Sequence, residues 1–225
     1  MKQQEIWQEI YAQGQQINHY PWDNVVSFVF SHKPDKPREL TKILEVGCGG
    51  GGNLWFAARE GFSVTGIDFS KAAIDYAKTR FEQENLSGHF IVGSFEQLPT
   101  EERSYDLIID RGALVCAPLS DVKLAVKQIH ALLNEGGKFL FTPFSQQHSC
   151  FDESLCDEEC YLTITKGPLQ KVGKLSFVNK TIIEEIFSTG WKILSLKHIA
   201  YDEENQEADY HHAEYCIIAE KKTNE

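Results

Sequence analysis

Short apolar runs alternate with longer stretches of helical periodicity from residue 42 onward. The apolar runs at 42–46, 63–68, 89–93, 104–110 and 138–144 are predicted strands. Between them, 53–61, 70–85 and 120–137 have the apolar spacing of helices, and Ser70 is a predicted N-cap. This alternation predicts an α/β fold, doubly wound around a mainly parallel sheet.

The pattern changes after the fifth run. Residues 179–190 have helical spacing, and 191–200 and 214–222 are predicted strands without a helical segment between them. These two strands are therefore expected to pair antiparallel as a hairpin. Residues 145–178 are the least regular part of the chain, and we interpret them as a possible insertion on the substrate side of the site.

Length and composition are those of one ordinary globular domain. The 225 residues, 42% hydrophobic and 24% charged, fit a single domain over 1–225, in which 1–35 form an amino-terminal lid or cover. A net charge of −11 argues against the broad basic surface that nucleic-acid binding needs. The sequence shows neither a secretory signal nor an apolar stretch long enough for a membrane span, which favours a cytoplasmic protein.

The six cysteines are expected to be reduced thiols, since a cytoplasmic protein of this size seldom carries a disulfide framework. Four residues that can ligate zinc lie close together in sequence: His148, Cys150, Cys156 and Cys160. Their spacing lacks the closely paired cysteines of structural zinc sites, so free thiols are preferred and no metal is predicted.

The stretch "ILEVGCGGGGN" at 43–53 matches two cofactor patterns. With Gly47, Gly49 and Gly52 it fits the G-x-G-x-x-G fingerprint of dinucleotide binding. Counted from Glu45 through Gly47, Gly49 and Gly51, it fits the acid-x-G-x-G-x-G loop that holds S-adenosylmethionine. Asp68, which ends the second predicted strand, is placed to accept hydrogen bonds from a ribose in either case.

Other features favour S-adenosylmethionine over a dinucleotide. The carboxylate of Glu45 would repel a pyrophosphate but attract the cationic amino-acid end of S-adenosylmethionine. A terminal antiparallel hairpin is unlike the six-stranded parallel dinucleotide domain, and the residues after the fifth strand are too few for a separate substrate domain.

The motifs "ILEVGCGGGGN", "GIDFS", "YDLIIDRGAL" and "LLNEGGKFLF" together resemble the class I S-adenosylmethionine-dependent methyltransferases over about residues 42–144. The resemblance implies a seven-stranded Rossmann-like sheet with the last strand antiparallel. It also implies that the loop glycines approach the methionine part and that Phe69 packs on the adenine. Asn53, at the end of the loop, belongs to the same cofactor-binding set.

Two positions depart from or refine this pattern. The acid that the family often has after the third strand is replaced by Ser94 and Phe95, so the Ser94 hydroxyl or a backbone amide is expected to meet the adenine. "DRGAL" resembles a stretch of the thiopurine methyltransferases, in which the acid, here Asp110, faces the cofactor and the arginine, here Arg111, faces the substrate. The alternative is that Asp110 caps the next element and Arg111 pairs with it.

The predicted activity is methyl transfer from S-adenosylmethionine to oxygen, sulfur or nitrogen of a small-molecule acceptor such as a metabolite, sugar or natural product. Alignment and exclusion of water are the main requirements, and a hydroxyl acceptor also needs a general base, for which His148 and His212 are candidates. Tyr20 is a candidate lid aromatic near the sulfonium. The alternatives are an NAD-dependent oxidoreductase and a non-catalytic S-adenosylmethionine-binding module, and the oligomeric state is open.

Overall fold

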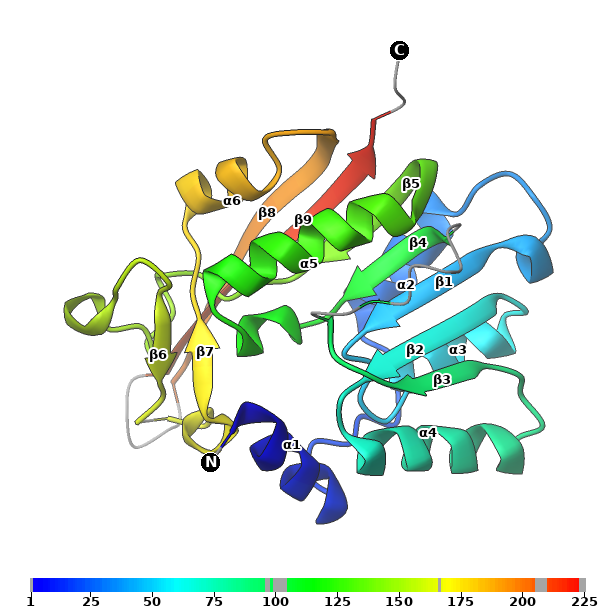
Figure 1. The fold of residues 1–225 in the computed structure, drawn as a ribbon, viewed down its shortest axis with the longest axis horizontal. Coiled ribbons are helices and arrows are strands. Elements are labelled where there is room, and N and C mark those ends of the chain that lie inside the picture. Colours follow the sequence, from blue (N-terminus) through cyan, green and yellow to red (C-terminus); the bar gives the residue numbers. More distant parts are fainter. Residues whose placement is uncertain (1, 96–97, 99–104, 166, 205–209, 223–225) are drawn as a thin grey trace.

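The computed structural model of the chain describes residues 2–95, 98, 105–165, 167–204 and 210–222. It contains a seven-stranded sheet in the order β3-β2-β1-β4-β5-β9-β8 (Figure 1). Its strands are β1 (Lys42–Val46), β2 (Ser63–Asp68), β3 (His89–Val92), β4 (Tyr105–Asp110), β5 (Leu133–Phe141), β8 (Trp191–Glu203) and β9 (Tyr210–Lys221). The first five strands are parallel to one another. β9 runs antiparallel to both of its neighbours, which confirms the predicted fold class and the terminal hairpin.

Apolar residues of the central strands alternate between two helix-covered faces, which explains why these strands have no polar side. Leu44, Val46 and Ile108 pack in one cluster with α5 (Leu119–Leu132) and α6 (Lys180–Ile186). Ile43 and Leu107 point the other way. They pack in a second cluster with α2 (Asp23–His32), α3 (Gly52–Arg59) and α4 (Lys71–Gln83).

The predicted boundaries hold for most elements and fail around β5. We expected a helix over 120–137 and a strand over 138–144, but α5 ends at Leu132 and Leu133 already pairs with Tyr105 of β4. Gly136 and Gly137 disfavour a helix there, and β5 ends before Pro143, which lacks an N–H for the ladder. Ser104, the predicted first residue of the fourth strand, lies outside the described residues.

Residues 145–178 form a separate small unit beside the carboxyl ends of the parallel strands. Its two-stranded sheet consists of β6 (Tyr161–Thr163) and β7 (Lys174–Ser176), and the 3-10 turn η5 (Gln170–Val172) lies between them. Leu162, Leu175 and Phe177 of this unit pack in an apolar cluster with Val115 and Cys116 of the turn after β4. A packed unit of this kind places side chains next to the sheet edge where ligands of α/β folds bind.

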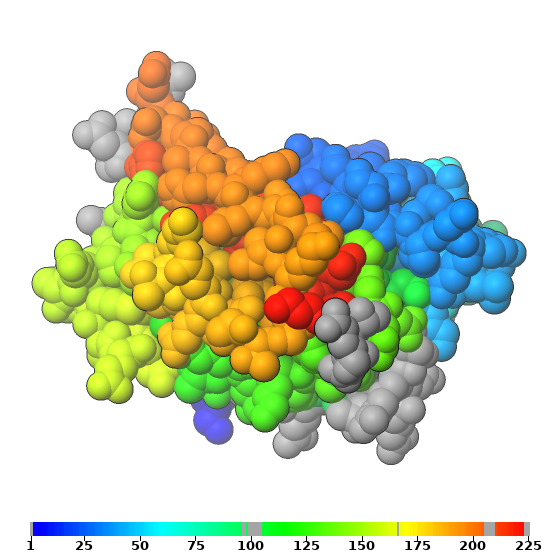
Figure 2. Space-filling model, turned by 90° about the horizontal axis from the view of Figure 1, so that it is seen from above, coloured from blue at the N-terminus to red at the C-terminus, as the bar shows by residue number. Residues whose placement is uncertain are grey.

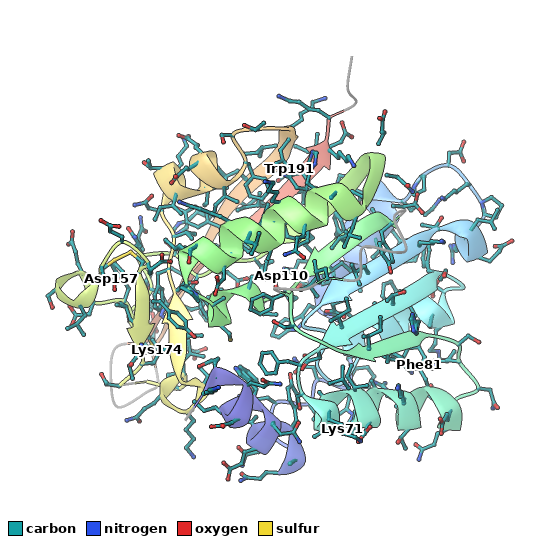
Figure 3. The ribbon with its side chains drawn as sticks, viewed as in Figure 1. Lys71, Phe81, Asp110, Asp157, Lys174 and Trp191 are labelled. Atoms are coloured by element: carbon teal, nitrogen blue, oxygen red, sulfur yellow. A yellow bond between two sulfur atoms is a disulfide. The ribbon has the colours of Figure 1, made fainter. Side chains whose placement is uncertain are left out.

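Helix α1 (Gln3–Ala12) spans the gap between this unit and α4, as Figure 1 shows below the sheet. Gln3 donates to the carbonyl of Val172 and accepts from the backbone N–H of Lys174. Toward the other end of the helix, the Gln8 side-chain oxygen accepts from the Ser70 hydroxyl and the Ala72 N–H, at the start of α4. Figure 3 shows Lys174 and Lys71 on the two sides of α1. The helix is therefore tied at both ends across the site.

The cysteine prediction is wrong at two positions. Cys156 and Cys160 are joined in a disulfide, because a turn brings their Cα atoms to 4.7 Å, whereas Cys48, Cys116, Cys150 and Cys216 are free and buried. In the described part of the chain, no group of three or more His, Cys, Asp or Glu residues is placed to hold a metal ion. None of the helices described is long and apolar enough to cross a membrane.

Candidate functional site

A cavity of about 290 Å³ lies at the carboxyl ends of β1, β2, β4 and β5. The sheet contributes Gly47, Asp68 and Phe69 to its wall, and the loop after β4 contributes Arg111. The remaining wall comes from segments far apart in sequence: Trp7 and Tyr11 of α1, Trp22 before α2, Phe144 after β5, and His212 and Glu214 of β9. The topology therefore brings amino-terminal and carboxyl-terminal side chains to one edge of the sheet.

The glycine loop is shaped by close approach to its surroundings. Gly47 has a φ of +66°, and a Cβ placed on it would lie 2.0 Å from the Cβ of Ala113. Gly52, the first residue of α3, would meet the carbonyl oxygen of Asn18 at 2.4 Å. The loop thus packs against the strand-4 loop on one side and against the amino-terminal segment on the other.

Asp68 links this loop to the cavity. Its Oδ2 accepts the backbone N–H of Gly49 at 2.9 Å and its Oδ1 accepts that of Ser70 at 2.8 Å. Burial raises the pKa of the carboxyl, while these two hydrogen bonds oppose the rise. A carboxylate has about four lone-pair positions. Asp68 therefore retains capacity to accept hydroxyl groups from a ligand in the cavity that it lines.

A smaller pocket of about 80 Å³ lies beside the glycine loop and includes Glu45 and Asn53. Asn53 donates from Nδ2 to Glu45 Oε1 at 2.6 Å and accepts the backbone N–H of Trp22 at Oδ1. Glu45 Oε2 is buried and has no hydrogen-bond partner among the described residues. Burial raises the pKa of Glu45 to about 8, with nearby Asp110 and Asp68 adding to the rise. A cationic ligand in this pocket would favour the ionised carboxylate and pair with its unpartnered oxygen, so the pocket fits such a ligand.

The two pockets meet at a shared wall. Six residues line both of them: Tyr11, Gln16, Asn18, Trp22, Gly47 and Arg111. The pocket at Glu45 and the larger cavity, which contains Asp68 and His212, are therefore neighbours with a common wall.

Asp110 and Arg111 occupy different environments. Asp110 is fully buried, and its Oδ1 accepts the backbone N–H groups of Ala113 and Leu114. Figure 3 shows it at the end of β4. It therefore caps the following turn, as the alternative interpretation expected, and is not among the residues of the cavity wall. Burial raises the pKa of Asp110 to about 7 against these hydrogen bonds.

Arg111 faces the cavity, but its ionic partner is not Asp110. Its Nη1 and Nη2 donate to the two carboxylate oxygens of Glu214 at 3.2 and 3.3 Å, and its guanidinium carbon lies 4.3 Å from the ring centroid of Trp22. His212 joins this group, with Nε2 at 3.5 Å from Glu214 Oε2. Local sequence could not predict the pairing of Arg111 with Glu214, because the two residues are 103 positions apart.

The two candidate histidines differ in access. His212 lines the cavity. His148 is 2% exposed: its Nδ1 accepts the N–H of Cys150, so its Nε2 carries the proton in the neutral ring and donates to the Tyr210 hydroxyl at 3.1 Å. Burial and the charges of His212 and His211 lower the pKa of His148 to about 4. Both ring nitrogens of His148 are therefore engaged behind His212.

The remaining predicted residues are dispersed around the site. Phe69 lines the cavity, as do Gly93 and Phe95 on the two sides of Ser94. Gly51 instead packs toward α4, where a Cβ placed on it would lie 3.1 Å from the Cβ of Ala77. Tyr20 is 75% exposed and lies edge-on to Trp55 in a separate surface groove. Tyr20 was expected near the cofactor, but Trp22 occupies that position. The backbone N–H of Trp22 donates to Asn53, which fixes Trp22 at the start of α2, and the Trp22 side chain lines the cavity.

Sequence reasoning missed Trp7, Tyr11, Cys116, Leu169 and Glu214 in the cavity wall. Three of these had a local signal. Trp7 and Tyr11 are four positions apart and therefore share one face of α1, and Glu214 is two positions after His212 and therefore shares its face of β9.

Comparison with known proteins finds sequence similarity over part of the chain. Residues 43–137 match the family described as a methyltransferase domain. A ubiquinone biosynthesis O-methyltransferase of Coxiella burnetii is 32% identical over 109 residues, which are 48% of this chain and 46% of that protein. The chain thus spans about half the length of the curated relatives that head this comparison.

Solved structures share the fold at low sequence identity. A SAM-dependent methyltransferase of Methanosarcina mazei matches with a TM-score of 0.70 at 19% identity, covering 88% of this chain and 98% of that one. The [4+2]-cyclase SpnF matches with a TM-score of 0.71 at 16% identity, covering 99% of this chain and 97% of that one. The sheet order and the helix layers are therefore common to proteins with different named activities.

Proposed function

We propose that the chain is a class I S-adenosylmethionine-dependent methyltransferase, and that it transfers a methyl group from S-adenosylmethionine to oxygen, sulfur or nitrogen of a small-molecule acceptor. The curated relatives that suggest this activity match about half of the chain, and we propose the activity for the whole chain.

The single observation that carries the proposal is the unpartnered carboxylate oxygen of Glu45. This oxygen is buried at the pocket that continues into the larger cavity, and Asn53 occupies the other oxygen of the same carboxylate. A buried acid without a cationic partner is costly, and a ligand with a positively charged group would remove the cost. NAD carries its pyrophosphate where such an acid would oppose it, which favours the sulfonium cofactor over a dinucleotide.

The residues of this chain fit S-adenosylmethionine from one end to the other. We assign Asp68 to the ribose hydroxyls, Phe69 and Phe95 to the adenine, and Glu45, beside the glycine loop, to the amino-acid end. The cofactor supplies a methyl carbon that its sulfonium leaving group has already activated for displacement. Trp22 and Tyr11, in the wall common to both pockets, would exclude water and place aromatic faces beside that cation.

Calorimetric titration tests the cofactor assignment. We expect S-adenosylmethionine and S-adenosylhomocysteine to bind and NAD not to bind. Glu45→Gln should weaken S-adenosylmethionine binding, and Glu39→Gln, at an exposed acid near β1, should leave it unchanged. Binding of NAD without binding of S-adenosylmethionine would overturn the assignment.

A methyl-transfer assay over acceptors that carry hydroxyl, thiol and amine groups tests the catalytic part separately. Methylation of any of these acceptors supports it. Tight cofactor binding with no transfer to any acceptor would instead support a non-catalytic binding module. The fold of the SpnF cyclase shows why the two questions need separate answers.

A further inference from the structure

We place the acceptor beside four apolar side chains of the cavity wall: Trp7, Cys116, Phe144 and Leu169. The same wall contains one polar group of three residues, Arg111, His212 and Glu214. Arg111 and Glu214 lie beside them, half-buried and buried respectively, and pair through two hydrogen bonds, so their charges offset each other. An acceptor in this space meets flat apolar walls and no uncompensated charge from this pair, which favours a planar, uncharged molecule.

His212 is the titratable group that this region leaves available. Its Nε2 faces Glu214, and no hydrogen bond joins its Nδ1 to a residue in the described part of the chain. The carboxylate of Glu214, 3.5 Å from Nε2, attracts a proton on that nitrogen, which favours the neutral tautomer protonated on Nε2. The lone pair that can take up a proton is then on Nδ1.

Three neighbouring rings contact the ring of His212. Tyr201 stacks on it at a centroid distance of 4.8 Å, and the rings of Phe144 and His148 meet it edge-on at 5.9 and 5.2 Å. The charged and titratable groups around it come from β8, β9, the loop after β4 and the segment after β5: Tyr201, Tyr210, Glu214, Arg111 and His148. His148 stays neutral above about pH 4, so it adds no positive charge beside His212 at neutral pH.

We propose, on the basis of the methyltransferase function above, that the acceptor is a planar hydroxylated aromatic compound and that His212 is the general base that removes the proton of its hydroxyl. Glu214 is the positioning residue: it holds the tautomer of His212, and Arg111 anchors Glu214 against Trp22. This deepens the proposed function by choosing oxygen among the acceptor atoms and an aromatic ring among the substrate classes.

The step balances without a further reactant. The O–H bond of the acceptor breaks and its proton passes to Nδ1 of His212, while the oxygen forms a bond to the methyl carbon. The carbon–sulfur bond breaks and its electron pair remains on sulfur, which becomes a neutral thioether. The imidazolium then releases its proton to water, and Glu214 stabilises the positive charge in the interval.

Three matched probes test the choice of atom: 2-naphthol, 2-naphthalenethiol and 2-naphthylamine, each assayed with S-adenosylmethionine from pH 6 to pH 9. We expect 2-naphthol to be methylated, with a rate that falls as pH is lowered through the range in which histidines are protonated. His212→Gln should reduce this rate roughly 10²- to 10⁴-fold and remove the acid limb of the profile, because the base is lost. Transfer to the thiol, which ionises without help, should change less than tenfold.

His211→Gln is the matched control, since the neighbouring histidine pairs with Asp202 at 2.7 Å and is not in the cavity wall. Glu214→Gln should lower kcat and move the acid limb of the pH–rate profile to lower pH, because the imidazolium loses its anionic partner. If Glu214 had a purely structural role, the acid limb of that profile would stay in place. Calorimetry should show unchanged S-adenosylhomocysteine affinity in His212→Gln.

The possible failures are distinguishable. Full 2-naphthol turnover by His212→Gln, or methylation of only the thiol or the amine, overturns the role of His212 and the choice of oxygen but leaves the proposed methyltransferase function intact. Failure of 2-naphthol to be methylated while other acceptors react has the same meaning. No transfer to any acceptor and no binding of S-adenosylmethionine would overturn the proposed function itself.

Discussion

The backbone N–H of Gly49 donates to the carboxylate of Asp68 at 2.9 Å, so the acid at the end of β2 holds the turn that follows β1. These two strands are neighbours in register, with Val46 opposite Ile67. One side chain therefore both fixes the shape of the glycine loop and forms part of the cavity wall.

Asp68→Ala should weaken cofactor binding by about 1–3 kcal/mol, because charged hydrogen bonds to the ligand and the support of Gly49 are both lost. That range corresponds to roughly a 5- to 150-fold rise in Kd for S-adenosylhomocysteine, measured by calorimetry. Asp75→Ala is the control, since Asp75 is exposed on α4 and pairs with Lys71. Unchanged affinity in Asp68→Ala would remove this residue from the cofactor site.

Gly47→Ala should destabilise the protein more than Gly136→Ala does. Both glycines have positive φ, +66° and +68°, so both substitutions cost roughly 1–2 kcal/mol in backbone strain. Only at Gly47 would the new Cβ meet a neighbour, Ala113, at 2.0 Å, whereas nothing lies within 4 Å at Gly136. The clash should add about 1–3 kcal/mol, measured by urea denaturation. Equal losses at the two positions would contradict the packing described for the loop.

The pKa of Glu45 predicts how the stability of the free protein depends on pH. Its pKa is raised from 4.5 to about 8 in the folded state, mainly by burial. Between these values the folded protein keeps a proton that the unfolded chain releases, so the free energy of unfolding should fall as pH rises from about 5 to 8. Glu45→Gln should make this fall shallower in urea denaturation at pH 5.5 and 8, and Glu39→Gln should follow the native protein. A native slope in Glu45→Gln would contradict the buried, unpartnered state of this acid.

Gln8→Ala should speed the release of S-adenosylhomocysteine. Its side-chain oxygen accepts two hydrogen bonds at the start of α4, worth about 0.5–1.5 kcal/mol each, and they hold α1 over the cavity. Tryptophan fluorescence can follow the release, because Trp7 and Trp22 line the cavity. We expect a severalfold faster dissociation rate, and no change in Gln13→Ala, whose side chain donates to exposed Glu9 and accepts from exposed Gln15. Equal rates in the two variants would show that α1 does not limit release.

Much of the fold was predictable from sequence, because the strands and helices are encoded locally. The strand at 42–46, the glycine loop and Asp68 follow one another within a single β-α-β unit, so spacing alone places them together. The cofactor residues that we propose could be selected from sequence for this reason.

The acceptor side was less accessible to sequence reasoning, since its contacts join distant segments. Nothing near Arg111 in sequence indicates that its partner is Glu214 on the last strand. Likewise, the choice between His148 and His212 depends on which ring faces the cavity, and only the backbone N–H of Cys150 and the hydroxyl of Tyr210 explain why His148 does not. The Cys156–Cys160 disulfide depends in the same way on a turn within 145–178.

The hairpin of β8 and β9 extends beyond the part of β9 that pairs with β5, which covers only 217–220. His212 and Glu214 lie on the extension, opposite Tyr201 and Ile199 of β8, a strand largely exposed on the face shown in Figure 2. Under the proposed function, the cofactor would bind at the ends of β1 and β2, whereas the acceptor would meet this extension of the hairpin. Substitutions on the extension would then change the choice of acceptor without touching the cofactor residues.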